Sequence, residues 1–300
     1  MTRASTLLAL LLVAPAAARA DETEENFVYM PAPNSESLTV DQPLGRLTLN
    51  GWDSPEVRIH SVKRAPDGAT LDKLKVSVEM RDGKIHVQTG VRVGGQFRSM
   101  PVQSAKIDLT IDAPRGAKVN ATTWSGDLNA SGFRAGAVLE SLSSGEVRAR
   151  EIQGKVVSHS HTGRQWLEAI HGDVEADGES GDVELAHIDG DVLEAKTVEG
   201  QIRARQVTTP VVRLQGGGIV LIGTLRSGGR YQLIALDGDV RLELKPAPFS
   251  VVAQASGRVA SAFALRGKIA PSQVDAVYQG GGPSLVLRAD RGDVLLQQQR

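Results

Sequence analysis

The chain has 300 residues, with 34 Lys and Arg against 35 Asp and Glu, and it contains no cysteine. A net charge of -1 and an aromatic content of 4% supply neither the basic surface nor the stacking platforms that nucleic acids need, so nucleic-acid binding is not expected. Without cysteine there are no disulfides and no thiolate metal sites, so burial and backbone pairing must stabilise the fold.

Residues 1–20 have the features of a secretory signal peptide. Arg3 gives a positive start, Leu7–Val13 is apolar, and Ala18 and Ala20 form a small-x-small cleavage site. We expect cleavage after Ala20 and export to the periplasm or the cell exterior. The apolar stretch is shorter than the roughly 20 residues that cross a bilayer, and none follows it, so no transmembrane segment is expected.

Residues 21–117 are expected to form irregular β-hairpins that cap the rest of the chain and continue into it. Leu44–Trp52 and Glu56–His60 alternate apolar with polar residues around a turn, which predicts a first hairpin. Lys73–Met80 and Lys84–Gln88 flank an Asp-Gly pair, which is typical of a tight turn, and predict a second.

Two more segments complete this region. Val91–Met100 contains a Gly-Gly pair and little pattern, which favours a mobile surface loop. Ala105–Asp112 alternates strictly and predicts a strand.

A short repeat follows. From Gly145 to Gly190 a glycine recurs every nine residues, and most copies continue with a charged residue and a branched aliphatic. The copies are of two alternating kinds: one has Ser or Thr directly before glycine, as in Ser144-Gly145, and the other has an aliphatic two residues before it, as in Ile152 before Gly154. Each kind recurs every 18 or 19 residues, which predicts two opposed strands in each coil.

The predicted fold class is therefore all-β: a single-strand-repeat β-solenoid, similar to a parallel β-helix, with about 18 residues per coil and two opposed sheets. Residues 118–245 should form its regular part. The second and fourth residues after each glycine are mostly apolar and should point inward. Ile152, Ile170 and Ile188 should then stack in one column.

Residues 246–300 are expected to hold the last coils and a cap. Ser284–Leu296 repeats the Gly-Asp-Val signature and predicts terminal coils. Because an open solenoid end is an exposed strand edge, the segment 246–283 should cover it.

These features resemble a bacterial adhesin-like family of β-strand repeats of unknown function. The resemblance rests on Gly45–Asp53, on the hairpin Leu74–Gln88, on Ile107–Gly116 leading into the first Ser-Gly-Asp unit, and on the closing Gly-Asp-Val. It covers nearly all of the chain after residue 20 and implies an exported or envelope-associated β-solenoid. It brings no catalytic residues.

The candidate ligand contact is Trp166, with Arg148 one coil before it and Glu184 one coil after it on the same sheet. An exposed tryptophan between charged neighbours would suit a sugar or a peptide. In the alternative, Gln165 breaks the apolar pattern and a local bulge turns Trp166 into the core.

A metal site is a second candidate. His159 and His161 are two residues apart on one strand face, His171 follows one unit later, and imidazoles are ligands for zinc or nickel. The alternative is that these histidines are exposed beside turns. Aspartates after glycine suggest calcium, but Lys155 and Arg164 replace them in alternate copies, which disfavours a uniform cage. These aspartates are Asp127, Asp173, Asp182, Asp191, Asp239 and Asp293.

No motif for nucleophilic catalysis, phosphate binding or zinc hydrolysis is present, so neither an enzyme nor a cofactor is expected. The expected function is a non-catalytic, adhesin-like surface that binds an envelope polysaccharide or protein. The alternatives are a structural or stress-linked envelope module that acts through strand pairing and, less favoured, a glycan-acting enzyme. The oligomeric state stays open.

Overall fold

The structure, a computed structural model, describes residues 21–29, 37–81, 83–102 and 104–299. The predicted all-β class is confirmed: two mixed sheets hold the chain, and α1 (Gly68–Leu71) is the only helix in these ranges. This helix is not long and apolar enough to cross a bilayer. The predicted signal peptide lies outside the described residues, so export stays a prediction.

The described strands form two sheets, which we name A and B. Sheet A has 13 strands in the order β1 (Asp21–Tyr29), β4 (Val57–Ala65), β8 (Lys106–Pro114), β3 (Leu47–Trp52), β10 (Leu128–Ser131), β12 (Val147–Gln153), β14 (Gln165–His171), β16 (Val183–Ile188), β18 (Gln201–Val207), β20 (Gly218–Gly223), β22 (Val240–Leu244), β28 (Val294–Gln298), β24 (Val259–Ser261).

Sheet B has 15 strands in the order β25 (Arg266–Ala270), β26 (Gln273–Tyr278), β23 (Phe249–Ala255), β27 (Ser284–Ala289), β21 (Arg230–Ala235), β19 (Val211–Gly216), β17 (Val192–Thr197), β15 (Val174–Gly178), β13 (Val156–Ser160), β11 (Ala137–Ser144), β9 (Lys118–Ser125), β2 (Ser37–Leu44), β6 (Lys84–Val93), β5 (Leu74–Arg81), with β7 (Gln96–Arg98) beside β6.

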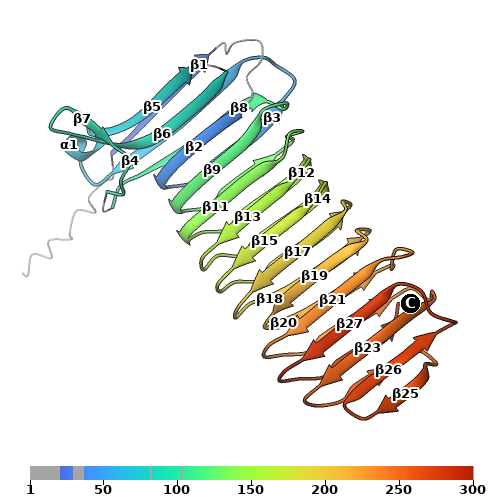
Figure 1. Ribbon diagram of the computed structural model, residues 1–300. Coiled ribbons are helices and arrows are strands. Elements are labelled where there is room, and N and C mark those ends of the chain that lie inside the picture. Colours follow the sequence, from blue (N-terminus) through green and yellow to red (C-terminus); the bar gives the residue numbers. More distant parts are fainter. Residues whose placement is uncertain (1–20, 30–36, 82, 103, 300) are drawn as a thin grey trace, which may run out of the picture.

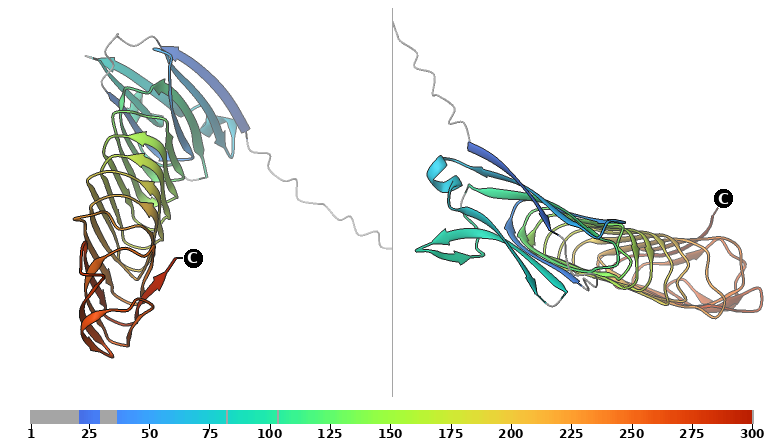
Figure 2. Two further views of the ribbon diagram at one scale, coloured as in Figure 1. Left: turned by 90° about the vertical axis from the view of Figure 1, so that its right-hand side faces the viewer. Right: turned by 90° about the horizontal axis from the view of Figure 1, so that it is seen from above.

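From β9 to β22 the chain alternates between the two sheets, and each strand lies parallel to the strand one coil before it (Figure 1). Ile152 lies opposite Ile170, and Ile170 opposite Ile188, so partners are 18 residues apart, as the repeat predicted. All three side chains are fully buried. Viewed from above, the successive coils overlie one another, and the N-terminal strands spread into two arms (Figure 2).

The core is a single apolar column between the sheets. The inward positions that the repeat predicted are buried, among them Val147, Val174 and Leu185. Around Gly190 the pattern shifts by one residue: Val192 is half-buried and Leu193 takes the inward position opposite Val174. Because each coil contributes only a few aliphatic side chains, stability depends on stacking rather than on any one coil.

The two kinds of repeat unit correspond to the two turns of a coil. Gly145 and Gly163 lie in the turn before a sheet A strand, and Gly154 and Gly172 in the turn before a sheet B strand. In both turns the glycines of successive coils touch: a Cβ on Gly163 would lie 1.7 Å from the Gly145 carbonyl oxygen, and one on Gly172 would lie 2.3 Å from that of Gly154. The spacing of the glycines therefore follows from the close contact between coils.

Each sheet A strand from β12 to β18 also contains a bend that the sequence did not predict. Glu151, Ala169, His187 and Gln206 occupy the same place in their coils and have φ between +53° and +55°. A left-handed residue inserts one extra outward position, after which Ile152 and its equivalents point inward again. These residues are not glycine, so their type gave no signal.

The first predicted hairpin is wrong. β3 and β4 do not pair, because β8 lies between them, parallel to β3 and antiparallel to β4. Ile111 of β8 lies opposite Leu49 on one side and Ile59 on the other, and all three are buried. A strand from further along the chain thus provides the apolar contacts that a hairpin would have provided.

The second predicted hairpin is confirmed: β5 pairs with β6, and Gly83 in the turn has φ of +72°. The loop predicted at Val91–Met100 is wrong, because β6 continues to Val93 and β7 folds back on it across Gly94 and Gly95. The strand predicted at Ala105–Asp112 is confirmed as β8.

Ser284–Leu296 forms a coil on the regular part, as predicted, and the segment 246–283 supplies the strands that lie outside it, as expected of a cap. β27 lies between β21 and β23, and β28 lies between β22 and β24. The segment 249–278 forms the outermost strands first, and the chain then returns to fill the place between them and the regular coils. Phe249, Phe263 and Tyr278 contact one another at ring distances of 5.0–5.4 Å and close this end of the core.

Candidate functional site

Trp166 lies on the outer face of sheet A, in the middle of a row of three predicted site residues. Arg148 of β12 and Glu184 of β16 are its direct neighbours on either side. Trp166 is 37% exposed, whereas its chain neighbours Gln165 and Leu167 are buried. Because strand residues alternate between faces, the burial of these two neighbours places the indole outside.

The alternative in which Trp166 turns into the core is wrong, and Gln165 shows why. The buried Gln165 amide accepts a hydrogen bond from Ser158 Oγ (2.6 Å) and donates one to the Asp177 carbonyl oxygen (2.8 Å). These two bonds compensate its burial and connect sheet A to sheet B across the core. Gln165 is thus held inside without a bulge at Trp166.

Arg148 lies beside the indole ring and is fixed from the other side. Its guanidinium carbon is 5.8 Å from the ring centroid of Trp166, within the range of a cation–π contact. Its Nη2 donates to Glu146 Oε2 at 2.6 Å, and this hydrogen bond raises the pKa of Arg148 above its ordinary value. The guanidinium is therefore charged and oriented while its outer edge stays available.

A hollow of about 390 Å³ lies next to Trp166 on the same face. It exists because side chains shorten along the row from Trp166 and Arg148 to Asn129 and Thr48. The lining is made of Thr48, Leu49, Asn50, Asn129, Ala130, Ser131, Arg148, Ala149, Arg150, Trp166 and Glu168.

Two small polar residues of the hollow, Asn50 and Ser131, are held by hydrogen bonds. Asn50 donates from Nδ2 to Asp112 Oδ1 at 2.9 Å, and its own Oδ1 accepts from Ser131 Oγ at 3.4 Å. Sequence reasoning missed Asn50, Asn129 and Ser131. Only the pairing of their strands would have indicated them, because Asn50 and Ser131 lie opposite each other on strands that are far apart in the chain.

Glu184 is next to Trp166 in register but does not line the hollow. Its Oε2 is 4.0 Å from Arg205 Nη2, on the side away from Arg148. The structure therefore brings Trp166 and Arg148 together at the hollow and places Glu184 at its border.

The three predicted metal ligands do not meet. His159 is on β13 of sheet B, His161 follows the end of that strand, and His171 is at the end of β14 of sheet A. Each Nδ1 has its own carboxylate one coil later: Asp177 at 3.7 Å from His159, Glu179 at 3.1 Å from His161 and Asp189 at 2.9 Å from His171. Among the residues that the structure describes, no three His, Cys, Asp or Glu side chains are grouped to hold a metal ion.

The aspartates that suggested calcium have a structural role. Asp173 Oδ1 accepts hydrogen bonds from the backbone N–H of Asp191 and of Val192, both at 2.9 Å. Asp182 does the same for the Gln201 N–H at 3.0 Å. A carboxylate after glycine thus binds the turn of the next coil, which accounts for its recurrence without any ion.

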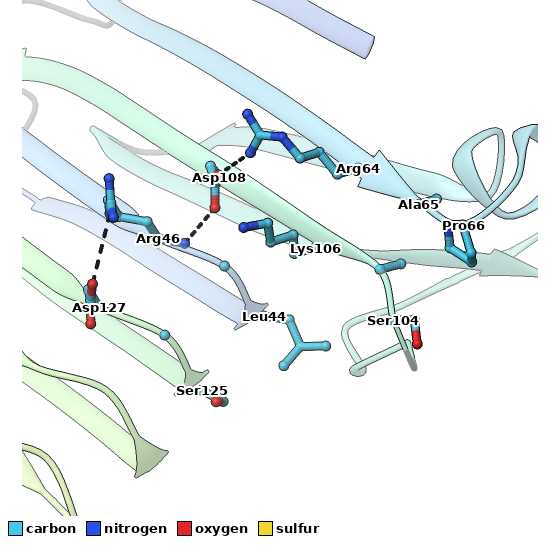
Figure 3. A pocket seen from close by; sticks show the side chains of 13 residues that line it. Leu44, Arg46, Arg64, Ala65, Pro66, Ser104, Lys106, Asp108, Ser125 and Asp127 are labelled. Atoms are coloured by element: carbon cyan, nitrogen blue, oxygen red, sulfur yellow. Dashed lines mark hydrogen bonds and ion pairs between the residues drawn. The ribbon is translucent and has the colours of Figure 1, made fainter. Parts of the chain in front are cut away.

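A larger hollow of about 1040 Å³ lies where the N-terminal strands meet the first regular coil (Figure 3). Asp108 lies between two arginines there: its carboxylate pairs with the Arg64 guanidinium and accepts from the Arg46 backbone N–H at 2.9 Å. Arg46 Nε is also 3.9 Å from Asp127. Because these arginines are already paired, the hollow offers a ligand less free charge than its composition suggests.

No protein-family model matches the sequence, and the comparison with curated proteins found no match. Among solved structures, a candidate adhesin from Bacteroides fragilis is 11% identical with a TM-score of 0.42, covering 91% of this chain and 96% of its own. A candidate adhesin from Parabacteroides distasonis is 11% identical with a TM-score of 0.40, covering 93% and 98%. A candidate cell adhesion protein from Clostridium sporogenes is 10% identical with a TM-score of 0.26, covering 93% and 100%.

The names of these structures agree with the adhesin-like family that the sequence resembles.

Proposed function

We propose that the protein is an exported β-solenoid of the adhesin-like type that binds a polysaccharide of the cell envelope without acting on it chemically. The binding site is the hollow beside Trp166 on the outer face of sheet A. The observation that carries this proposal is an exposed indole next to an oriented guanidinium and a row of amide and hydroxyl side chains.

This set of side chains fits a sugar better than it fits a protein. The face of a pyranose ring is apolar and stacks on an aromatic ring, whereas its rim carries hydroxyls that both donate and accept hydrogen bonds. The side chains of Asn50, Asn129 and Ser131 can both donate and accept hydrogen bonds, and the Arg148 guanidinium only donates them. Neighbouring strands lie about 4.7–4.9 Å apart, so an extended polymer that crosses them would meet Asn129, Arg148 and Trp166 in turn.

The geometry favours binding over catalysis. A catalytic pair of carboxylates would need one acid with a raised pKa in an enclosed cleft. In the hollow, Glu168 is half-buried on an open sheet face and its neighbours in register are Arg150 and Ala186. Export rests on the sequence of residues 1–20 alone.

The test is calorimetric titration of the purified protein with neutral and acidic polysaccharides and with soluble peptidoglycan fragments. Trp166→Ala should weaken binding by about tenfold or more, which corresponds to roughly 1.4 kcal/mol. Trp124→Ala is the matched control, because Trp124 is 54% exposed but belongs to sheet B. Equal binding by the Trp166 variant and the unmodified protein, or no binding to any of the glycans, would refute the proposal.

A further inference from the structure

The C-terminal end of the rod has a free strand edge. β25 is the outermost strand of sheet B, and no described strand pairs with its outer side. All five of its residues are exposed, including Ile269 at 59%. Unpaired N–H and C=O groups on such an edge form a template for a further strand.

Sheet B extends beyond sheet A at this end, which explains the exposure of Ile269. Sheet A ends at β24, whereas β26 and β25 continue sheet B past β23. Ile269 lies opposite Val274, which is buried, so it is on the core side of the sheet. No described strand of sheet A covers it there.

The charges on β25 have one sign. Arg266 and Lys268 are both exposed and make no ion pair with any described residue. Their cross-strand neighbours in β26 are Val277 and Asp275. The free edge therefore presents positive charge next to unpaired backbone groups.

The outermost strand of sheet A at the N-terminal end has acidic side chains. β1, the outermost strand of sheet A, begins with the sequence DETEE. Glu22 and Glu25 pair with Arg64 and Lys63 of the neighbouring strand β4. Glu24 is exposed and, within the described ranges, has no ion-pair partner.

We infer that β25 of one copy of this chain pairs with β1 of the next copy, which joins the rods head to tail. Like charges disfavour pairing of two β25 edges or of two β1 edges, whereas the opposite charges of β25 and β1 attract. The other N-terminal edge, β5, has the sequence LKVSVEMR and is not acidic, so charge selects β1. Such a contact uses two different surfaces and extends into an open chain rather than a closed dimer.

Head-to-tail pairing would place several copies of the Trp166 hollow on one assembly. Weak contacts with a polymer then add up through effective concentration. The inference itself concerns self-association and does not depend on what the hollow binds.

The test is sedimentation velocity of the purified protein over a range of concentrations at low ionic strength. The unmodified protein should form species that lengthen with concentration and shorten with added salt. Arg266→Glu should leave the sheet intact, because the cross-strand neighbour of Arg266, Val277, is uncharged. It should raise the dissociation constant of self-association by about tenfold or more. Glu24→Lys, at the other end, should have the same effect.

Mixing the two variants distinguishes head-to-tail pairing from other modes. Each variant keeps the end that the other has lost, so the mixture should associate at concentrations at which each variant alone is mostly monomeric. Arg230→Glu, a reversal of an exposed charge in the middle of sheet B, is the control and should associate normally. A monomer at every concentration, association that survives both reversals, or a mixture that stays monomeric would overturn the inference.

Discussion

Replacing Gly163 with alanine tests whether contact between coils fixes the glycine period. The added Cβ would lie 1.7 Å from the carbonyl oxygen of Gly145 and 2.6 Å from its carbon. Contacts below 3.0 Å essentially do not occur, so the two coils must separate locally by more than about 1 Å. The φ of Gly163 is outside the left-handed range, so the effect is steric alone.

The expected cost follows from two contributions. Overpacking a tight contact costs about 1–3 kcal/mol. The separation also strains the neighbouring hydrogen bond from the Val147 N–H to the Arg164 carbonyl oxygen, 2.9 Å long, and losing a buried backbone bond costs about 1–3 kcal/mol. We expect the free energy of unfolding to fall by about 3 kcal/mol and the melting temperature to fall by roughly 6–12 °C.

Calorimetry measures the melting temperature, and hydrogen exchange should show lost protection in β12 and β14. Gly218→Ala is the matched control, because its Cβ would have no neighbour closer than 3.7 Å and its φ is also outside the left-handed range. The reasoning is refuted if the two variants melt within about 1 °C of each other, because contact between coils would then not require glycine at Gly163.

Two further predictions concern charged side chains. Asp173→Ala should lower the free energy of unfolding by about 1–2 kcal/mol because two backbone N–H groups lose their acceptor. Asp173→Asn keeps an acceptor oxygen and should retain most of this stability. Millimolar calcium should leave the melting temperature of the unmodified protein unchanged, and stabilisation by calcium would contradict the structural role of Asp173. The hydrogen bond from Lys196 and the charge of Arg213 lower the pKa of Glu194 below its ordinary 4.5. A lowered carboxyl pKa stabilises the fold above the unfolded pKa, and this contribution disappears as the pH falls through the folded pKa. Lys196→Met should therefore raise the Glu194 pKa toward 4.5, which carboxyl NMR can follow. The same variant should lose less than about 1 kcal/mol of stability at neutral pH and none at pH 2. An unchanged Glu194 pKa would contradict the assignment.

The regular coils could be predicted because every determinant there is local and repeated. Gly145, Gly154 and Gly163 mark successive turns, and the residues after each glycine alternate between the core and the surface. A coil of two units brings the chain back to the same sheet, so a residue pairs with the residue one full repeat later. This aligns Ile152 with Ile170. The same alternation left the direction of Trp166 open, because Gln165 breaks the apolar pattern. The hydrogen bonds that hold Gln165 inside decide it in the structure.

The ends of the rod and the hollow could not be predicted because they depend on pairs of strands that no period connects. An alternating strand has the same pattern whether its neighbour is the next strand or one further on, so β8 could take the place between β3 and β4 without any signal in Leu44–His60. The insertion of β27 between β21 and β23 is of the same kind. Side-chain period thus fixed which residues face the core, whereas the choice of neighbours required the packed structure. That choice placed Asn50 beside Ser131 and completed the hollow. Backbone pairing is equally satisfied by any strand of the right length, and only the packing of the whole core distinguishes among them.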